Sequence, residues 1–165
     1  MLNEAVRAWD QNGLGVPITQ QVRTELWLDG LEVPIIGYAD YILDGFCLDL
    51  KTTLRCPSSP RFNHALQISG YAKARSEDRG GLFYVTPKKS AIYMIGQEEI
   101  DRSIADVHRR ALSVQTSLRM AMDQSNGSVN SAKHLLAQMC PPDLDSFYWS
   151  DAGFAAAQSQ IPAWQ

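Results

Sequence analysis

The sequence has few cysteines and no long apolar run. Its three cysteines, Cys47, Cys56 and Cys140, are widely spaced and odd in number, which argues against a disulfide framework and predicts reduced, packed thiols. No apolar run approaches the roughly 18 residues that span a bilayer, and no basic-then-apolar leader stands at the N-terminus. We therefore expect an intracellular, cytoplasmic protein with no membrane partner.

An excess of positive charge is also absent, since the formal net charge is −3. The charge is nevertheless uneven: the stretch from Lys51 to Lys89 holds eight basic and two acidic residues, a net +6 that leaves −9 for the rest. Such a stretch could meet backbone phosphates, although a solvated helix face explains part of the same charge. The candidate DNA-contacting residues in it are Arg55, Arg61, Lys73, Arg75, Lys88 and Lys89.

Length and composition are those of a globular protein. A chain of 165 residues with 45% hydrophobic and 20% charged residues fits one domain. We expect a single domain over residues 1–165, with a core over about 19–124 and a helical and aromatic extension over 125–165. The aromatic side chains of that extension are expected to lie across the core, with stacking on single-stranded bases as the alternative.

The order of apolar patterns predicts one helix, three strands, a second helix, two strands and a long helix. Two-residue hairpin turns are expected at Asp29-Gly30 and Asp44-Gly45. This order predicts an α/β protein with a central mixed β-sheet flanked by helices. The apolar stripe of the long helix fits core packing or a homo-oligomer interface. The expected helices are 2–12, 60–76, 97–124 and 129–139, and the expected strands are 19–28, 33–43, 46–53, 81–87 and 90–96.

The hairpin at 37–53 carries the strongest chemical signal. A type I′ turn at Asp44-Gly45 would place Asp40 directly opposite Asp49, with Lys51 on the same face. Two opposed carboxylates repel each other unless a cation lies between them, and Mg²⁺ or Mn²⁺ prefers such oxygen ligands. A lysine beside the ion could position or activate a water. The alternative is an exposed polar row on a solvent-facing hairpin.

The helix expected at 60–76, with Ser59 as its N-cap, carries a polar stripe. His64, Gln67 and Tyr71 follow i, i+3, i+7 spacing and therefore share one helical face. That stripe could face the carboxylates of the preceding hairpin. The alternative is an ordinary amphipathic helix with a hydroxyl at its edge.

Three motifs in order resemble the PD-(D/E)XK nuclease superfamily. They are Gly37-x-x-Asp40, Asp49-x-Lys51-Thr52 and Gln67-x-x-x-Tyr71, and the resemblance covers about residues 20–95. The likeness is to the RecB-like exonuclease branch, which includes phage exonucleases and CRISPR-associated adaptation nucleases. It implies a restriction-endonuclease-like fold. It also implies a metal-dependent DNA nuclease and favours an exonuclease of recombination, repair or phage replication.

The resemblance also assigns roles to individual residues. Asp40 and Asp49 would hold Mg²⁺ or Mn²⁺, with the Leu50 carbonyl as an additional ligand. The lysine would position the attacking water or stabilise the developing charge. The glutamine would orient the water or a neighbouring ligand, and the tyrosine would contact DNA. The implied catalytic set is Asp40, Asp49, Lys51, Gln67 and Tyr71.

Two features depart from the branch. No histidine precedes Asp40, so Glu4 and Asp10 are the positional candidates for an upstream ligand, with a solvated helix face as the alternative. Some relatives hold an iron–sulfur cluster with four cysteines, a set that this chain lacks. The missing histidine keeps a rival hypothesis open, a non-catalytic nucleic-acid-binding module that retains the fold.

Overall fold

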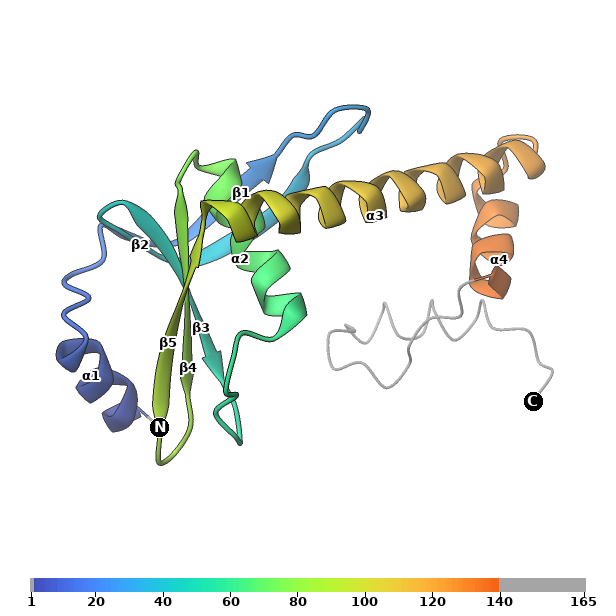
Figure 1. Cartoon of the computed structure of the whole chain (residues 1–165). Helices are drawn as coiled ribbons and strands as arrows, with labels where there is room; N and C mark the ends of the chain where they lie inside the picture. The colour runs from blue at the N-terminus through green and yellow to red at the C-terminus, as the bar shows by residue number, and fades with distance from the viewer. Residues whose placement is uncertain (1, 140–165) are drawn as a thin grey trace. The chain divides into compact units, whose positions relative to one another are not determined.

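The computed structural model describes residues 2–139, and its elements follow the predicted order (Figure 1). The helices are α1 (Leu2–Gln11), α2 (Phe62–Ala74), α3 (Gln97–Gln124) and α4 (Val129–Met139). The strands are β1 (Thr19–Leu26), β2 (Ile35–Leu43), β3 (Phe46–Thr52), β4 (Arg79–Val85) and β5 (Ser90–Gly96). The expected positions of Cys140 and of the aromatic side chains beyond it lie outside the described residues.

The described chain separates into two compact units. The first extends to Arg110, and the second begins at Ala111. The boundary therefore lies within α3, whereas the expected core extended to about residue 124. All candidate site residues belong to the first unit.

A five-stranded mixed sheet organises the first unit, in the order β1-β2-β3-β4-β5. The β3–β4 pair is parallel, and the other neighbouring pairs are antiparallel. A parallel pair needs a crossover connection, which α2 provides between these two strands. The prediction of an α/β protein with a mixed sheet flanked by helices is confirmed.

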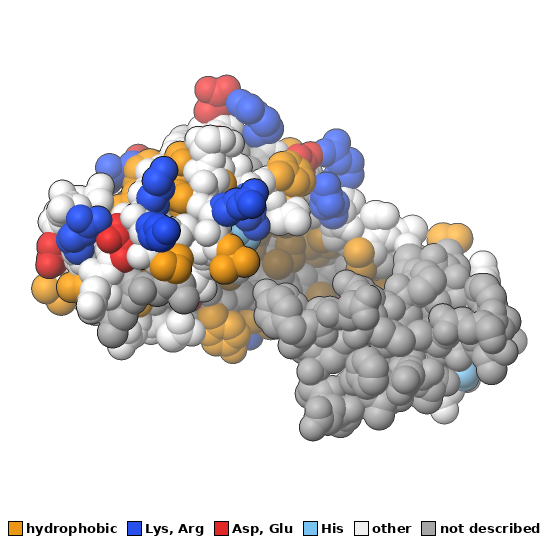
Figure 2. Space-filling model, turned by 90° about the horizontal axis from the view of Figure 1, so that it is seen from below, with side chains coloured by type: hydrophobic (Ala, Val, Ile, Leu, Met, Phe, Trp, Pro, Cys, Tyr) orange, Lys and Arg blue, Asp and Glu red, His pale blue; other side chains and the backbone are white. Residues whose placement is uncertain are grey.

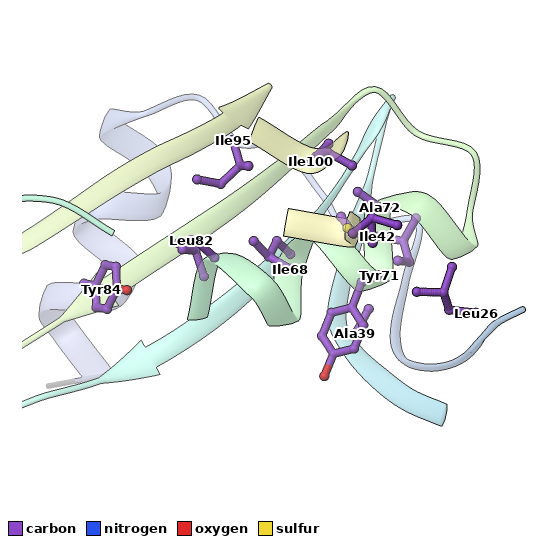
Figure 3. Packing of buried hydrophobic residues seen from close by; sticks show 13 residues of the cluster. Leu26, Ala39, Ile42, Ile68, Tyr71, Ala72, Leu82, Tyr84, Ile95 and Ile100 are labelled. Atoms are coloured by element: carbon purple, nitrogen blue, oxygen red, sulfur yellow. The ribbon is translucent and has the colours of Figure 1, made fainter. Parts of the chain in front are cut away.

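Each face of the sheet carries its own apolar cluster. Cys47 and Leu48 are consecutive in β3 and point to opposite faces, as strand geometry requires. Cys47 belongs to a cluster beneath α2 that includes Ile68 and Ile100 (Figure 3). Leu48 belongs to a cluster beneath α1 that includes Phe83. Figure 1 shows α1 and α2 on opposite sides of the sheet.

The β2–β3 hairpin has the predicted register next to its turn. Leu43 pairs with Phe46, and the ladder continues to the pair of Tyr41 and Leu48. The predicted type I′ turn is wrong, because Gly45 has φ +77° but Asp44 is not in the left-handed region that this turn requires at both positions.

The β1–β2 connection is longer than predicted. Residues 27–34 link the strands, with a turn in which the Leu31 N–H donates to the Leu28 carbonyl at 3.1 Å. Glu25 pairs with Ile36 rather than with Pro34, so the predicted two-residue hairpin at Asp29-Gly30 is wrong. The prediction took the Asp-Gly pair as the whole loop.

Helix α2 begins later than predicted. Its N-cap is Arg61, whose side chain makes no capping hydrogen bond, so Ser59 does not cap this helix. Within the described residues, no helix is both long enough and apolar enough to cross a membrane.

Candidate active site

Asp40 lies where the β2–β3 ladder stops. Its Oδ2 accepts a hydrogen bond from the Leu50 N–H at 2.8 Å, and its Oδ1 accepts one from Gln21 Nε2 at 3.1 Å. The carboxylate thus meets a backbone donor of β3 beyond the last ladder pair, Tyr41 with Leu48. The predicted direct pairing of Asp40 with Asp49 is therefore not part of the ladder. Both residues lie just beyond its last pair, at a place that we call the opening of the hairpin.

Gln21, in the neighbouring edge strand, has a strained backbone. Its φ of +53° is in the left-handed region, which is uncommon for a residue other than glycine. Such strain persists only where surrounding contacts hold it, and the hydrogen bond to Asp40 is one such contact. No motif marks Gln21, so the sequence did not indicate it as a site residue.

Asp49 is a buried carboxylate, with 2% of the residue exposed. Burial raises its pKa and the charge of Asp40 raises it further, while Lys51 opposes the shift. Lys51 Nζ lies 2.7 Å from Asp49 Oδ2. This contact is an ion pair without hydrogen-bond alignment, since Oδ2 accepts no hydrogen bond within the described residues. The charge of Asp40 therefore acts on Asp49, although the predicted ladder pair of the two is absent.

Lys51 joins the hairpin to α2. Its Nζ donates to Gln67 Oε1 at 2.8 Å, and Gln67 Nε2 donates to the Tyr71 hydroxyl at 2.6 Å. We call Asp49, Lys51, Gln67 and Tyr71 the polar chain. The structure thus brings together the second and third motifs, and the Gln67–Tyr71 face of α2 is directed at the hairpin.

Tyr71 has a buried ring and a polar end. The residue is 8% exposed, and Figure 3 shows its hydroxyl projecting out of the cluster beneath α2. A Cβ on Gly37 would lie 2.4 Å from Tyr71 Cε1, which explains in packing terms why the first motif has glycine there. Burial raises the pKa of Tyr71, Gln67 opposes this and the charge of Asp49 adds to it, so the phenol stays protonated at neutral pH.

His64 contacts Tyr84 and is not part of the polar chain. Its Nδ1 lies 2.8 Å from the Tyr84 hydroxyl, which also accepts the Arg61 N–H at 3.1 Å. Burial lowers the pKa of His64, and the charges of Lys51 and Arg61 lower it further. Tyr84 was not anticipated, because it stands within an apolar strand pattern that predicts only core packing.

Neither upstream acid is placed at the opening. Glu4 forms an ion pair with Arg7 at 2.8 Å and accepts a hydrogen bond from Ser90 at 3.2 Å. Helix α1, which carries Glu4 and the exposed Asp10, packs on the face of β3 opposite to the polar chain. Within residues 2–139 there is no group of three His, Cys, Asp or Glu side chains suited to a metal ion. Asp40 and Asp49 are thus a two-carboxylate site.

The predicted DNA-contacting residues divide into two sets. Arg75 is paired with Glu77 at 2.8 Å, and Lys73 lies 3.6 Å from Asp101. Among the described residues, the other four form no ion pair: Arg55, Arg61, Lys88 and Lys89.

The four unpaired cations lie on connections that leave one end of the sheet. The Thr53 N–H donates to the Val85 carbonyl at 2.9 Å, which brings the loop after β3 beside the end of β4. Tyr93 of β5 donates to the Pro57 carbonyl at 2.7 Å and holds the same loop. Figure 2 views the molecule from below Figure 1, where the β4–β5 turn lies, and shows dispersed basic side chains with few acidic ones. This end of the sheet can attract anions.

Comparisons with known proteins do not assign the chain to a family. Neither a family model nor a curated protein matches the chain. The chain is similar to the crystal structure of SSO0001, with 24% identity and a TM-score of 0.44. The similarity covers 64% of this chain and 57% of the length of that one. A likeness of this size establishes neither a family nor a function.

Proposed function

We propose that the protein is a metal-dependent DNA nuclease, and specifically an exonuclease. The observation that carries the proposal is the buried Asp49 beside Asp40, joined through Lys51 and Gln67 to the Tyr71 hydroxyl. A buried carboxylate with a perturbed pKa, next to a second acid and a lysine, is typical of a reactive centre.

The donor set fits a hard divalent cation. Asp40 and Asp49, together with the Leu50 carbonyl, would hold Mg²⁺ or Mn²⁺, ions that take oxygen ligands and keep several waters. The buried Asp49 carboxylate favours a cation nearby, and its Oδ2 accepts no hydrogen bond from the described part of the chain. When bound, such an ion lowers the pKa of a coordinated water and neutralises charge on a phosphate oxygen.

The protein's own side chains would orient the reacting groups. Lys51 is held between Asp49 and Gln67, so its ammonium has a fixed position from which it can donate to a phosphate oxygen or a water. Gln67 uses its carbonyl on Lys51 and its amide on Tyr71, which fixes its orientation. The Tyr71 oxygen accepts from Gln67, so its own proton is available for a DNA phosphate.

DNA would approach across the end of the sheet that carries the unpaired cations. Arg61 stands at the N-cap of α2, where the helix dipole also favours an anion. Lys88 and Lys89 lie in the β4–β5 turn. These charges would hold the backbone on one side of the opening while Lys51 meets the phosphate to be cut.

The test is cleavage of end-labelled linear, circular and single-stranded DNA with Mg²⁺ or Mn²⁺. We expect products from linear DNA only when metal is added, and on the order of a thousandfold loss in Asp49→Asn. The matched control is Asp44→Asn, the same change at the exposed turn of the same hairpin, which should retain full activity. Metal-independent cleavage, or an unaffected Asp49→Asn, would contradict the proposal.

A second candidate is a nucleic-acid-binding module without turnover. The observation in its favour is that the described residues supply two carboxylates but no third ligating side chain. Calorimetric titration with Mn²⁺ separates the candidates when it is run beside the cleavage assay. DNA binding with neither Mn²⁺ binding nor product would support the module.

A further inference from the structure

A groove lies beside the polar chain, along one face of α2. It encloses about 360 Å³, within the usual size of small-molecule sites, about 300–1,000 Å³. One wall is the α2 face that carries Asn63, Gln67 and Gly70, and the opposite wall is formed by residues of β1 and β2. Val107 of α3, within the first unit, closes the groove further. Gln67 and Tyr71 line the groove and also belong to the polar chain, so the two are continuous.

The walls combine apolar surface with a few polar groups. Leu26, Ile35 and Leu66 supply apolar side chains. The Asn63 amide makes no hydrogen bond to any other described residue, so both its donor and its acceptor are available. Apolar walls with an available amide suit a heteroaromatic ring with hydrogen-bonding edges.

Gly70 leaves room in this groove. A Cβ built on it meets nothing within 4 Å, apart from its own helix. Gly70 has no left-handed backbone that would oppose substitution. A Cβ at position 70 therefore displaces no neighbour, and the atoms that follow it in a larger side chain would extend into groove space.

We propose that this groove binds one unpaired nucleobase of a DNA strand whose phosphate lies at Asp40 and Asp49. The inference rests on the proposed function and names its substrate class: a single-stranded or frayed DNA end. A base inside a duplex is stacked and paired, so it can enter a walled groove only after leaving the stack. The unpaired cations beyond Lys51 and the groove beyond Gln67 would then hold the backbone and the base on two sides of the polar chain.

The experiment uses single-stranded oligonucleotides with 2-aminopurine at each of the first four positions from either end. Wild-type protein is titrated with them in Ca²⁺, a divalent cation with oxygen ligands that can occupy the carboxylate site, and a gel checks that the oligonucleotide stays uncut. We expect emission to increase at one position only, because the base leaves its stacked neighbours for the groove. Gly70→Leu should abolish the increase without lowering the melting temperature. Gly96→Leu is the matched control, since a Cβ there also meets nothing and Gly96 is not in the groove.

Binding affinity gives the second readout. An abasic nucleotide at the responsive position should weaken binding by about tenfold, the scale of one lost base contact. An unchanged emission at every position, or an unaltered response in Gly70→Leu, would overturn the groove assignment even if the protein cleaves DNA. A position-specific response without cleavage would instead refute the nuclease and retain the base site. The two failures are therefore distinguishable.

Discussion

The two faces of β3 bury their side chains by different means. On the α1 face, Leu48 is fully buried in an apolar cluster with Phe83. On the α2 face, Asp49 is almost as deeply buried, but its carboxylate forms an ion pair with Lys51. Leu48 and Asp49 are adjacent in sequence, so strand alternation places an apolar and an ionisable group at the same depth of one sheet.

The difference shows where the chain gives up stability. Burial of a carboxylate disfavours its charged form, whereas burial of a leucine is favourable throughout. The raised pKa of Asp49 has burial as its main cause, with Lys51 opposing it. The α2 face therefore carries a cost that the α1 face does not, and a functional site is a physical reason for such a cost.

The largest effect on stability should come from Lys51→Met. This change removes the partner of a buried carboxylate, and we expect a loss of about 3 kcal/mol at pH 7, the low end for a broken buried pair because Lys51 is partly exposed. Urea unfolding measures it. The double variant Lys51→Met, Asp49→Asn should recover most of the loss; if it does not, packing of the lysine stem is the cause instead.

The pH dependence of this variant follows from the sign of the Asp49 shift. The folded-state pKa lies above the unfolded value, so the folded state binds the proton more tightly. Stability is then fullest below the unfolded pKa and falls as pH rises through the folded pKa. The deficit of Lys51→Met should therefore shrink toward acid pH. The measurement is urea unfolding over a range of pH. In Asp49→Asn, the free energy of unfolding should lack the pH-dependent part that Asp49 contributes.

A change on the other face should affect stability but not the site. Trp9 of α1 packs edge-on against Tyr41, with ring centroids 5.1 Å apart, and its Nε1 donates to the Gly15 carbonyl at 2.6 Å. Trp9→Ala should cost about 2 kcal/mol, below the roughly 3–5 kcal/mol of fully buried aromatic truncations because Trp9 is only half-buried. DNA cleavage below the melting temperature should be unchanged. A matching loss of cleavage would show that the two faces are coupled.

Gly37→Ala tests the packing that supports the polar chain. The added methyl would lie 2.4 Å from Tyr71 Cε1, so the ring or the strand must shift, at a cost of about 1–2 kcal/mol. Turnover should fall as well, because Tyr71 carries the end of the chain. Gly70→Ala is the control: it adds the same methyl in open space and should stabilise α2 by up to about 1 kcal/mol. Equal effects in both variants would contradict the packing explanation.

The sequence predicted elements better than connections. The order of helices and strands follows from apolar periodicity, and the pairing of Ile42 with Cys47 follows from a two-residue turn at Asp44-Gly45. The same reasoning failed at Asp29-Gly30, because a turn dipeptide does not show how many loop residues flank it. The prediction also failed at Ser59, since the helix begins two residues later than expected and has no side-chain cap.

The site was predicted as a set of residues but not as a network. Motif spacing brought Asp49, Lys51, Gln67 and Tyr71 to one region, and the structure joins them. The hydrogen bond from Leu50 to Asp40 was not foreseen, because strand registers assume that backbone groups meet one another. The groove could not be predicted, since its walls come from segments far apart in the chain.

The smallest expected effect belongs to Tyr71→Phe, which separates the ring from the hydroxyl. The ring packs in the cluster beneath α2. The hydroxyl accepts a hydrogen bond from the Gln67 side chain. If the hydroxyl donates to a DNA phosphate, its loss should cost turnover about 1 kcal/mol, roughly fivefold, with the melting temperature unchanged. Tyr38→Phe is the matched control, because Tyr38 is an exposed tyrosine of β2 and should tolerate the change silently. A silent Tyr71→Phe would confine this residue to packing and end the polar chain at Gln67.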